Sequence, residues 1–187
     1  MKKIIITVYS FDELSDEAKQ KAIETERHNE LRLDYNWWDG VFDNFREQFK
    51  EIGIDNADFA FSLSYTQGDY AKLTKGEIDM EKIIPKLSFR LEEYIKYYTS
   101  ACIINGDATF DFDDYKEHPC IYDYYDYYEK VVEQLEKWLN DKIEELNGEL
   151  YMALQEEYEY LQSDEVIAEE FKDNETLFYE DGTLYQY

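Results

Sequence analysis

The sequence predicts an α+β fold: a small antiparallel sheet packed with helices, a long acidic helix or helical hairpin, and a C-terminal β-hairpin. Residues 59–65 alternate large and small side chains, the period of two that is typical of a half-buried strand. Several other segments repeat apolar residues at spacings of three and four, which indicates amphipathic helices. Near the end of the chain, Asp181-Gly182 separates two strand-like runs, which indicates a hairpin.

The first half of the chain predicts a strand followed by two helices. Residues 2–9 are apolar and β-branched, which favours a strand, and Ser15 is a suitable N-cap for a helix over residues 16–33. A second helix begins at Asn36 and ends at Gly53, where glycine accepts the left-handed conformation of a helix end. Its apolar stripe consists of Trp38, Phe42, Phe45, Phe49 and Ile52.

The middle of the chain predicts a strand pair and a third helix. Residues 70–74 follow a turn at 67–69 and are the expected partner strand of residues 59–65. Apolar residues between Ile84 and Tyr98 repeat at helical spacing. Residues 101–121 lack a clear period, apart from a short alternation over 109–113.

A long helical pattern begins at Tyr122 and dominates the second half. Its seam consists of Val132, Leu135, Leu139, Ile143, Leu146, Leu150, Leu154 and Leu161. Asn147-Gly148 is the natural point for a kink or break, which would convert the helix into a helical hairpin. A short helix over 164–172 and the strands of the C-terminal hairpin, 176–180 and 183–187, follow.

The domain prediction places an α+β core in residues 1–100 and an acidic, Tyr-rich helical region with the hairpin in residues 101–187, packed on the core as one unit. Hydrophobic residues make up 44% of the 187 residues, and there are 19 Tyr, 11 Phe and 3 Trp. Disordered charge-rich chains are poor in aromatic residues, so this composition predicts an ordered core.

The net charge of −26 is concentrated in the second half. Residues 1–100 contain 20 acidic and 14 basic residues, whereas residues 101–187 contain 25 acidic and 5 basic ones. Such a field disfavours nucleic acid and anionic lipid, and it attracts basic protein surfaces. Solubility or salt adaptation is the alternative explanation, against which stand the 15 lysines and the many aromatic residues.

Motifs for catalysis or metal binding are not found. There is no Gly-rich phosphate loop, no His-Glu-x-x-His and no Gly-x-Ser-x-Gly. His118 and Cys120 are too few for a zinc site, and Asp111–Asp114 lacks the glycine and the downstream glutamate of a calcium loop. With two cysteines and no long apolar run, we expect a cytoplasmic, non-enzymatic protein without cofactor or metal.

A run of tyrosines and carboxylates stands out between residues 113 and 136. Carboxylates on a helix can meet the Lys and Arg side chains that normally hold phosphates, and Tyr rings can stack on Arg. The predicted partner-binding residues are Asp113, Asp114, Tyr122, Asp123, Tyr124, Tyr125, Asp126, Tyr128, Glu129, Glu133 and Glu136. The alternative is a solvated helix face whose tyrosines pack inward.

Four segments of the first eighty residues carry a resemblance to known proteins: Tyr9–Ala22 (YSFDELSDEAKQKA), Asp34–Trp38 (DYNWW), Phe49–Ile54 (FKEIGI) and Phe61–Asp69 (FSLSYTQGD). In order and spacing they resemble a family of small phage and prophage proteins, sometimes labelled antitoxin-like. Those relatives tend to have a Trp in the strand before Gln-Gly-Asp, where this chain has Tyr65.

The resemblance implies a phage origin, and small acidic phage proteins resemble inhibitors of host immunity. We therefore expect an inhibitor of the anti-CRISPR or anti-restriction type in the host bacterial cell. It would bind a basic nucleic-acid-handling protein, for example an RNA-guided nuclease such as an RNA-targeting type VI effector. Two alternatives remain: an antitoxin-like regulatory partner of a phage protein, and an enzyme that uses clustered carboxylates with a divalent metal.

Overall fold

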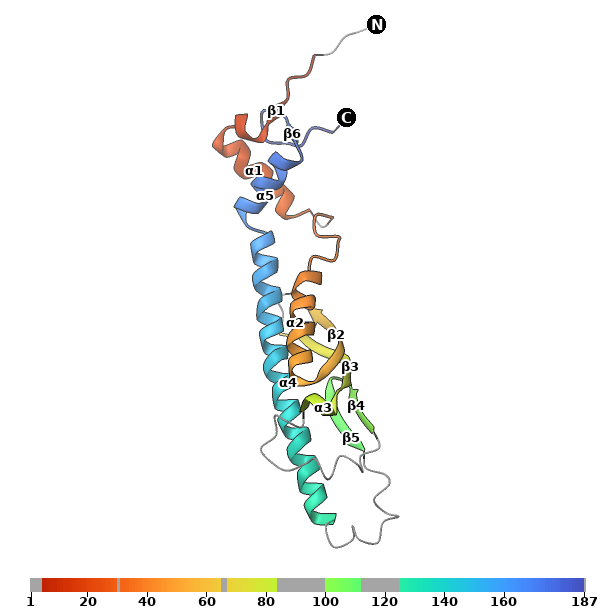
Figure 1. The fold of residues 1–187 in the computed structure, drawn as a ribbon. Helices are drawn as coiled ribbons and strands as arrows, with labels where there is room; N and C mark the ends of the chain where they lie inside the picture. Colours follow the sequence, from red (N-terminus) through yellow and green to blue (C-terminus); the bar gives the residue numbers. More distant parts are fainter. Residues whose placement is uncertain (1–4, 30, 65–66, 84–99, 112–124, 187) are drawn as a thin grey trace. The chain divides into compact units, whose positions relative to one another are not determined.

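The structure, a computed structural model, describes residues 5–29, 31–64, 67–83, 100–111 and 125–186. Helices and two-stranded antiparallel sheets make up the described residues, which confirms the α+β class (Figure 1). The elements are β1 (Tyr9–Ser10), a 3-10 helix η1 (Phe11–Glu13), α1 (Asp16–Arg27), α2 (Asp39–Ile52), β2 (Ile54–Ser62), β3 (Tyr70–Ile78), α3 (Met80–Ile83), β4 (Ser100–Ile104), β5 (Asp107–Asp111), α4 (Tyr125–Leu161), α5 (Asp164–Asp173) and β6 (Leu177–Phe178).

The chain forms two compact units, and each of them combines residues from both predicted domains. The terminal unit consists of residues 1–37 and 156–187, and the central unit consists of residues 38–155. The sequence interpretation divides the chain at residue 100 instead. The composition of the chain changes near residue 100. Residues 1–37 nevertheless pack with residues 156–187, which lie on the other side of that change.

The terminal unit is built around α1 and α5, which pack against each other. Its core consists of Phe11, Leu14, Ala18, Ala22, Ile23, Ile167, Phe171 and Phe178. The predicted cap is confirmed, since the Ser15 side chain accepts a hydrogen bond from the Ala18 amide. Ser163 caps α5 in the same way through Val166, and the predicted bounds of this short helix are close to the observed ones.

Most of the predicted strand over residues 2–9 is not a strand in the described part. Only Tyr9 and Ser10 pair, antiparallel to β6, while Ile5 has an exposed fraction of 94%. The reason lies at the other end of the chain. β6 is two residues long, and the chain then turns, with the Tyr179 amide donating to the Thr183 carbonyl at 2.8 Å.

The predicted C-terminal hairpin is present in a short form. Phe178 bridges Leu184, and the Tyr185 amide donates to the Leu177 carbonyl at 2.8 Å. Gly182 lies in the turn at φ +81°, and a Cβ atom there would come within 2.2 Å of the Ala18 carbonyl oxygen. Only glycine permits this close approach of the turn to α1.

The central unit confirms the predicted helix and strand pair that follow Trp38. In α2, Phe42 and Phe49 pack on Phe59 of β2, with ring centroids 5.1 and 5.3 Å apart. β2 pairs with β3 in antiparallel register, with Phe59 opposite Leu73. Gly53 ends α2 in the left-handed region at φ +97°, as the sequence predicts.

The hairpin of β4 and β5 is a feature that the sequence analysis did not anticipate. Asn105 and Gly106 join the two strands with φ values of +56° and +97°. Positive φ at both central residues is the type I′ geometry, which Asn-Gly favours strongly. The predicted third helix over residues 84–98 lies outside the described residues.

Helix α4 runs without a break from Tyr125 to Leu161. The long helix is therefore the correct alternative, and the break at Asn147-Gly148 does not occur. Five seam positions are buried: Leu135, Leu139, Ile143, Leu150 and Leu154. A Cβ atom on Gly148 would meet nothing within 4 Å, so this glycine lies on an open side of an ordinary helix.

Candidate functional site

The predicted partner-binding residues divide into those that the structure describes and those that it does not. Asp113, Asp114, Tyr122, Asp123 and Tyr124 lie outside the described residues. Tyr125, Asp126, Tyr128 and Glu129 belong to the first turns of α4, but their side chains also lie outside the description. Their role stays a prediction, and Glu133 and Glu136 are the two that can be placed.

Glu133 and Glu136 have different surroundings although both are on α4. Glu136 is partly buried, and its Oε1 accepts a hydrogen bond from the backbone amide of Phe110 at 3.0 Å. Glu133 is exposed and forms no ion pair with a described residue. The predicted partner-binding residues therefore include one carboxylate, Glu136, that has a structural role inside the fold.

Two asparagines of α4 make similar contacts with strand backbones. Asn140 Oδ1 accepts from the Ala108 amide at 2.6 Å, and its Nδ2 donates to the Ala108 carbonyl at 3.1 Å. Asn147 Oδ1 accepts from the Leu73 amide at 2.7 Å. Together with Glu136, these side chains attach β3 and β5 to α4. They form hydrogen bonds with backbone groups that have no partner within the two-stranded sheets.

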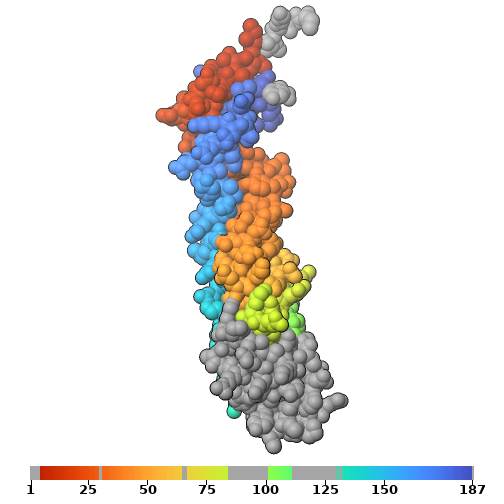
Figure 2. All heavy atoms as spheres, in the orientation of Figure 1, coloured from red at the N-terminus to blue at the C-terminus, as the bar shows by residue number. Residues whose placement is uncertain are grey.

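The open side of α4 is rich in carboxylates. Exposed acidic residues of the central unit on this helix are Glu133, Asp141, Glu144, Glu145 and Glu149, and α4 residues lie at the surface in Figure 2 (light blue). Lys137 pairs with Asp141 at 2.9 Å, and Lys142 pairs with Glu145. The hydrogen bond to Glu145, more than any other contact, raises the pKa of Lys142 above its ordinary value of 10.5.

Most of the cations that could balance these carboxylates are already paired. Nine of the thirteen Lys and Arg residues that the structure describes contact a carboxylate within 4.0 Å. In contrast, Glu133, Glu144 and Glu149 form no ion pair with a described residue. The excess negative charge is therefore exposed to solvent on a rigid helix.

Ion pairs also occur in the terminal unit. Arg32, with only 4% of its side chain exposed, binds Glu170 through two hydrogen bonds of 2.9 and 2.8 Å. Lys21 hydrogen-bonds to Asp181 at 2.6 Å. This contact, followed by the amide and hydroxyl of Thr183, lowers the pKa of Asp181 to about 2.

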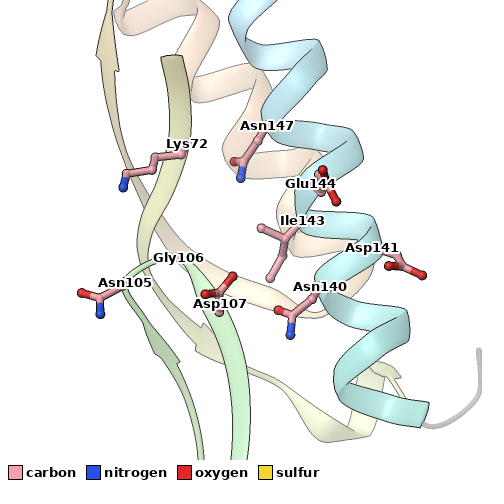
Figure 3. Close-up of a pocket in the computed structure, with 9 residues that line it drawn as sticks. All are labelled: Lys72, Asn105, Gly106, Asp107, Asn140, Asp141, Ile143, Glu144 and Asn147. Atoms are coloured by element: carbon pink, nitrogen blue, oxygen red, sulfur yellow. The ribbon is translucent and has the colours of Figure 1, made fainter. Parts of the chain in front are cut away.

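A pocket of about 250 Å³ lies between β3, the β4–β5 turn and α4, and Figure 3 shows its lining. The lining residues are Lys72, Asn105, Gly106, Asp107, Asn140, Asp141, Ile143, Glu144 and Asn147. Gly106 permits the close packing of the turn on β3, because a Cβ atom there would come within 2.6 Å of the Leu73 carbonyl oxygen. The lining includes three acidic residues and one lysine, but in Figure 3 Asp141 points away from the strands and Lys72 points away from α4.

Other kinds of site find little support among the described residues. His, Cys, Asp and Glu side chains nowhere gather in threes that could coordinate a metal ion within these residues. No helix in the described part of the chain combines the length and the apolar character that crossing a bilayer requires. Cys102 is exposed, with its Sγ 3.2 Å from Thr109 Oγ1, and Cys120 lies outside the described residues.

Four pocket residues were not among the predicted site residues: Asn105, Asp107, Asn140 and Asn147. Asn105-Gly106 was a usable signal, because Asn-Gly between two apolar runs indicates a tight hairpin. The two other asparagines carry no such signal. In the sequence, an asparagine beside an apolar helical seam gives the same pattern whether its side chain faces water or a strand backbone.

No family model, no curated protein and no solved structure matches this chain. The resemblance to phage proteins therefore stays a prediction.

Proposed function

We propose that the protein is a phage-encoded inhibitor of the anti-CRISPR or anti-restriction type. It binds a basic nucleic-acid-handling protein of host defence through its acidic, Tyr-rich surface. The observation that supports this best is the open side of α4, where Glu133, Glu144 and Glu149 form no ion pair with a described residue. A groove built for a sugar-phosphate backbone presents the Lys and Arg side chains that such carboxylates attract.

The spacing of the carboxylates suits such a groove. From Glu133 to Glu149 the helix rises by about 24 Å, at ~1.5 Å per residue. A groove that follows a nucleic-acid strand offers cations along a comparable length. One regular helix can therefore engage several of these cations at once.

The rigidity of α4 adds to the argument. Its apolar seam is buried, and Asn140 and Asn147 bind it to two strands. The helix backbone that carries the exposed carboxylates is therefore ordered before a partner arrives. Binding then costs less conformational entropy than ordering a flexible acidic tail would.

The test is a binding measurement against a purified type VI RNA-guided nuclease without its guide RNA. Affinity should fall steeply between 50 and 300 mM NaCl, and guide RNA should compete with the protein. The triple variant Glu133→Lys, Glu144→Lys, Glu149→Lys should bind at least about 10-fold more weakly, because each reversal replaces attraction with repulsion.

A matched control is the triple variant Glu24→Lys, Glu169→Lys, Asp173→Lys, which changes the net charge equally in the terminal unit at exposed positions. It should retain most of the affinity. Glu136 is left unchanged, because its reversal would also break the bond to Phe110. Salt-independent binding, or an equal loss in the two triple variants, would contradict the proposed surface.

A further inference from the structure

We infer that the pocket between the β4–β5 turn and α4 receives an arginine side chain of the partner. This inference rests on the proposed function, and it names the residue type that one point of the acidic surface recognises. Carboxylates from two elements line the pocket, Asp107 from β5 and Glu144 from α4, whereas Asp141 of α4 pairs with Lys137 and points away from the strands in Figure 3.

The dimensions of the pocket match a single side chain. Its volume of about 250 Å³ is below the 300–1,000 Å³ that is typical of pockets for drug-sized ligands. Ile143, which is 3% exposed, provides an apolar floor. Such a floor suits the methylene stem of a long basic side chain, whose charged group remains near the polar rim.

The walls of the pocket are fixed by contacts within the fold. Figure 3 shows Asp107, Asn140, Ile143 and Asn147 directed toward the space between the strands and α4. Both polar groups of Asn140 are bound to Ala108, and Asn147 Oδ1 is bound to the Leu73 amide. Each of these amide oxygens already accepts a hydrogen bond within the fold, so the negatively charged carboxylates of Asp107 and Glu144 are the stronger acceptors for a cationic ligand.

The spread of these acceptors favours a guanidinium group over a compact cation. No three carboxylates of the described residues converge on a point where a metal ion would sit. A guanidinium group carries five N–H donors in a plane and can bridge acceptors that are some distance apart. A lysine ammonium is a compact point charge and lacks this planar set of donors.

Lys72 places a positive charge at the same pocket, so its effect on arginine binding should be opposite to that of the carboxylates. It also lines the pocket, and its ammonium lies 5.6 Å from the centre of the Tyr70 ring rather than in an ion pair with a described carboxylate. This positive charge opposes a bound guanidinium. Removing it should therefore strengthen arginine binding, whereas removing Asp107 and Glu144 should weaken it.

The experiment is a titration of the full chain, labelled with ¹⁵N, with N-acetyl-arginine methylamide and separately with N-acetyl-lysine methylamide. Arginine should shift the amide signals of residues 105–107 and bind more tightly than lysine. The double variant Asp107→Asn, Glu144→Gln should weaken arginine binding about 5-fold, and Lys72→Gln should strengthen it about 2-fold.

Two controls carry the same charge changes outside the pocket. The double variant Glu169→Gln, Asp173→Asn removes two exposed carboxylates of α5, and Lys75→Gln removes an exposed cation of β3. Both should leave arginine binding within a factor of two. A spectrum with the dispersion of the unmodified protein shows for each variant that the fold is retained.

The outcomes separate this inference from the proposed function. Equal binding of arginine and lysine, or equal losses in the two double variants, would overturn the arginine pocket, while salt-dependent binding of the nuclease would still stand. Specific arginine binding by a protein that does not bind the nuclease would support the pocket and overturn the proposed target.

Discussion

Three side chains of α4 are hydrogen-bond partners for the backbones of β3 and β5: Asn140, Asn147 and Glu136. Each accepts a bond from a strand amide over 2.6–3.0 Å. A buried amide that loses its acceptor costs more than an average hydrogen bond contributes, because its desolvation is no longer offset. These side chains therefore influence stability more than their polar character suggests.

We predict that Asn147→Ala lowers the free energy of unfolding by about 1–3 kcal/mol, because the amide of fully buried Leu73 loses its acceptor. Asn147→Asp retains an acceptor and should cost less. Asn44→Ala, at an exposed position of α2, is the control and should change little. Urea denaturation followed by circular dichroism measures all three, and an Asn147→Ala protein as stable as the control would contradict the assignment.

Asp181 predicts a dependence of stability on pH in the terminal unit. Its pKa is lowered to about 2 in the folded chain, from an ordinary value of 3.8. The contribution of the Lys21–Asp181 contact is therefore fully present above pH 4 and is lost as the pH falls toward 2. In Asp181→Asn, thermal unfolding between pH 4 and pH 2 should depend less on pH than in the unmodified protein. Identical profiles would rule this contribution out.

Helix α4 shows how tertiary packing overrides a local turn signal, the Asn147-Gly148 pair. Asn-Gly is common in turns, and each of the two residues is a poor helix former in isolation. Here the seam on both sides of the pair is buried at Ile143 and Leu150, and Asn147 gains a strand amide. Burial and this bond outweigh a propensity cost of about 1 kcal/mol for glycine.

Gly148→Ala should therefore raise the free energy of unfolding by about 0.5–1 kcal/mol, since alanine restricts the unfolded chain and its Cβ enters open space. Gly182→Ala is the contrasting variant. Its Cβ would meet the Ala18 carbonyl, so we expect a clear loss of stability. Differential scanning calorimetry distinguishes the two. Destabilisation by Gly148→Ala would mean that α4 bends at this residue.

The net charge of −26 acts at the scale of the whole molecule. Like charges at this density oppose the compact state, although they also oppose aggregation. The ion pairs in the described residues are mostly exposed, and exposed pairs contribute little each. Self-repulsion should therefore be the larger electrostatic effect on stability.

We predict that the melting temperature rises by several degrees, about 5 °C, between 20 and 500 mM NaCl, because salt screens this repulsion. KCl should act equally, which distinguishes screening from a specific ion effect. Thermal unfolding followed by circular dichroism gives the answer. A melting temperature that falls with salt would show that ion pairs outweigh the net repulsion.

Periodicity predicted much of the fold, but it did not predict the contacts between segments that are remote in the sequence. The apolar stripe of α2, the Gly53 cap and the seam of α4 were predictable, because each is a spacing within one segment. The extent of the first strand was not, because it depends on how few residues β6 offers to pair with. For the candidate surface, the acidic excess was predictable from counts, whereas the use of Glu136 by Phe110 was not.

Composition and periodicity are local properties, and they were enough to predict the α+β class, the concentration of negative charge in the second half and the apolar seam of its long helix. The folded structure was needed to show that α4 continues through Asn147-Gly148, which exposed carboxylates form ion pairs, and that Asp107, Lys72 and Glu144 line one pocket. The physical reason is that these features depend on distances between residues that are remote along the chain, and spacing within a segment does not encode them.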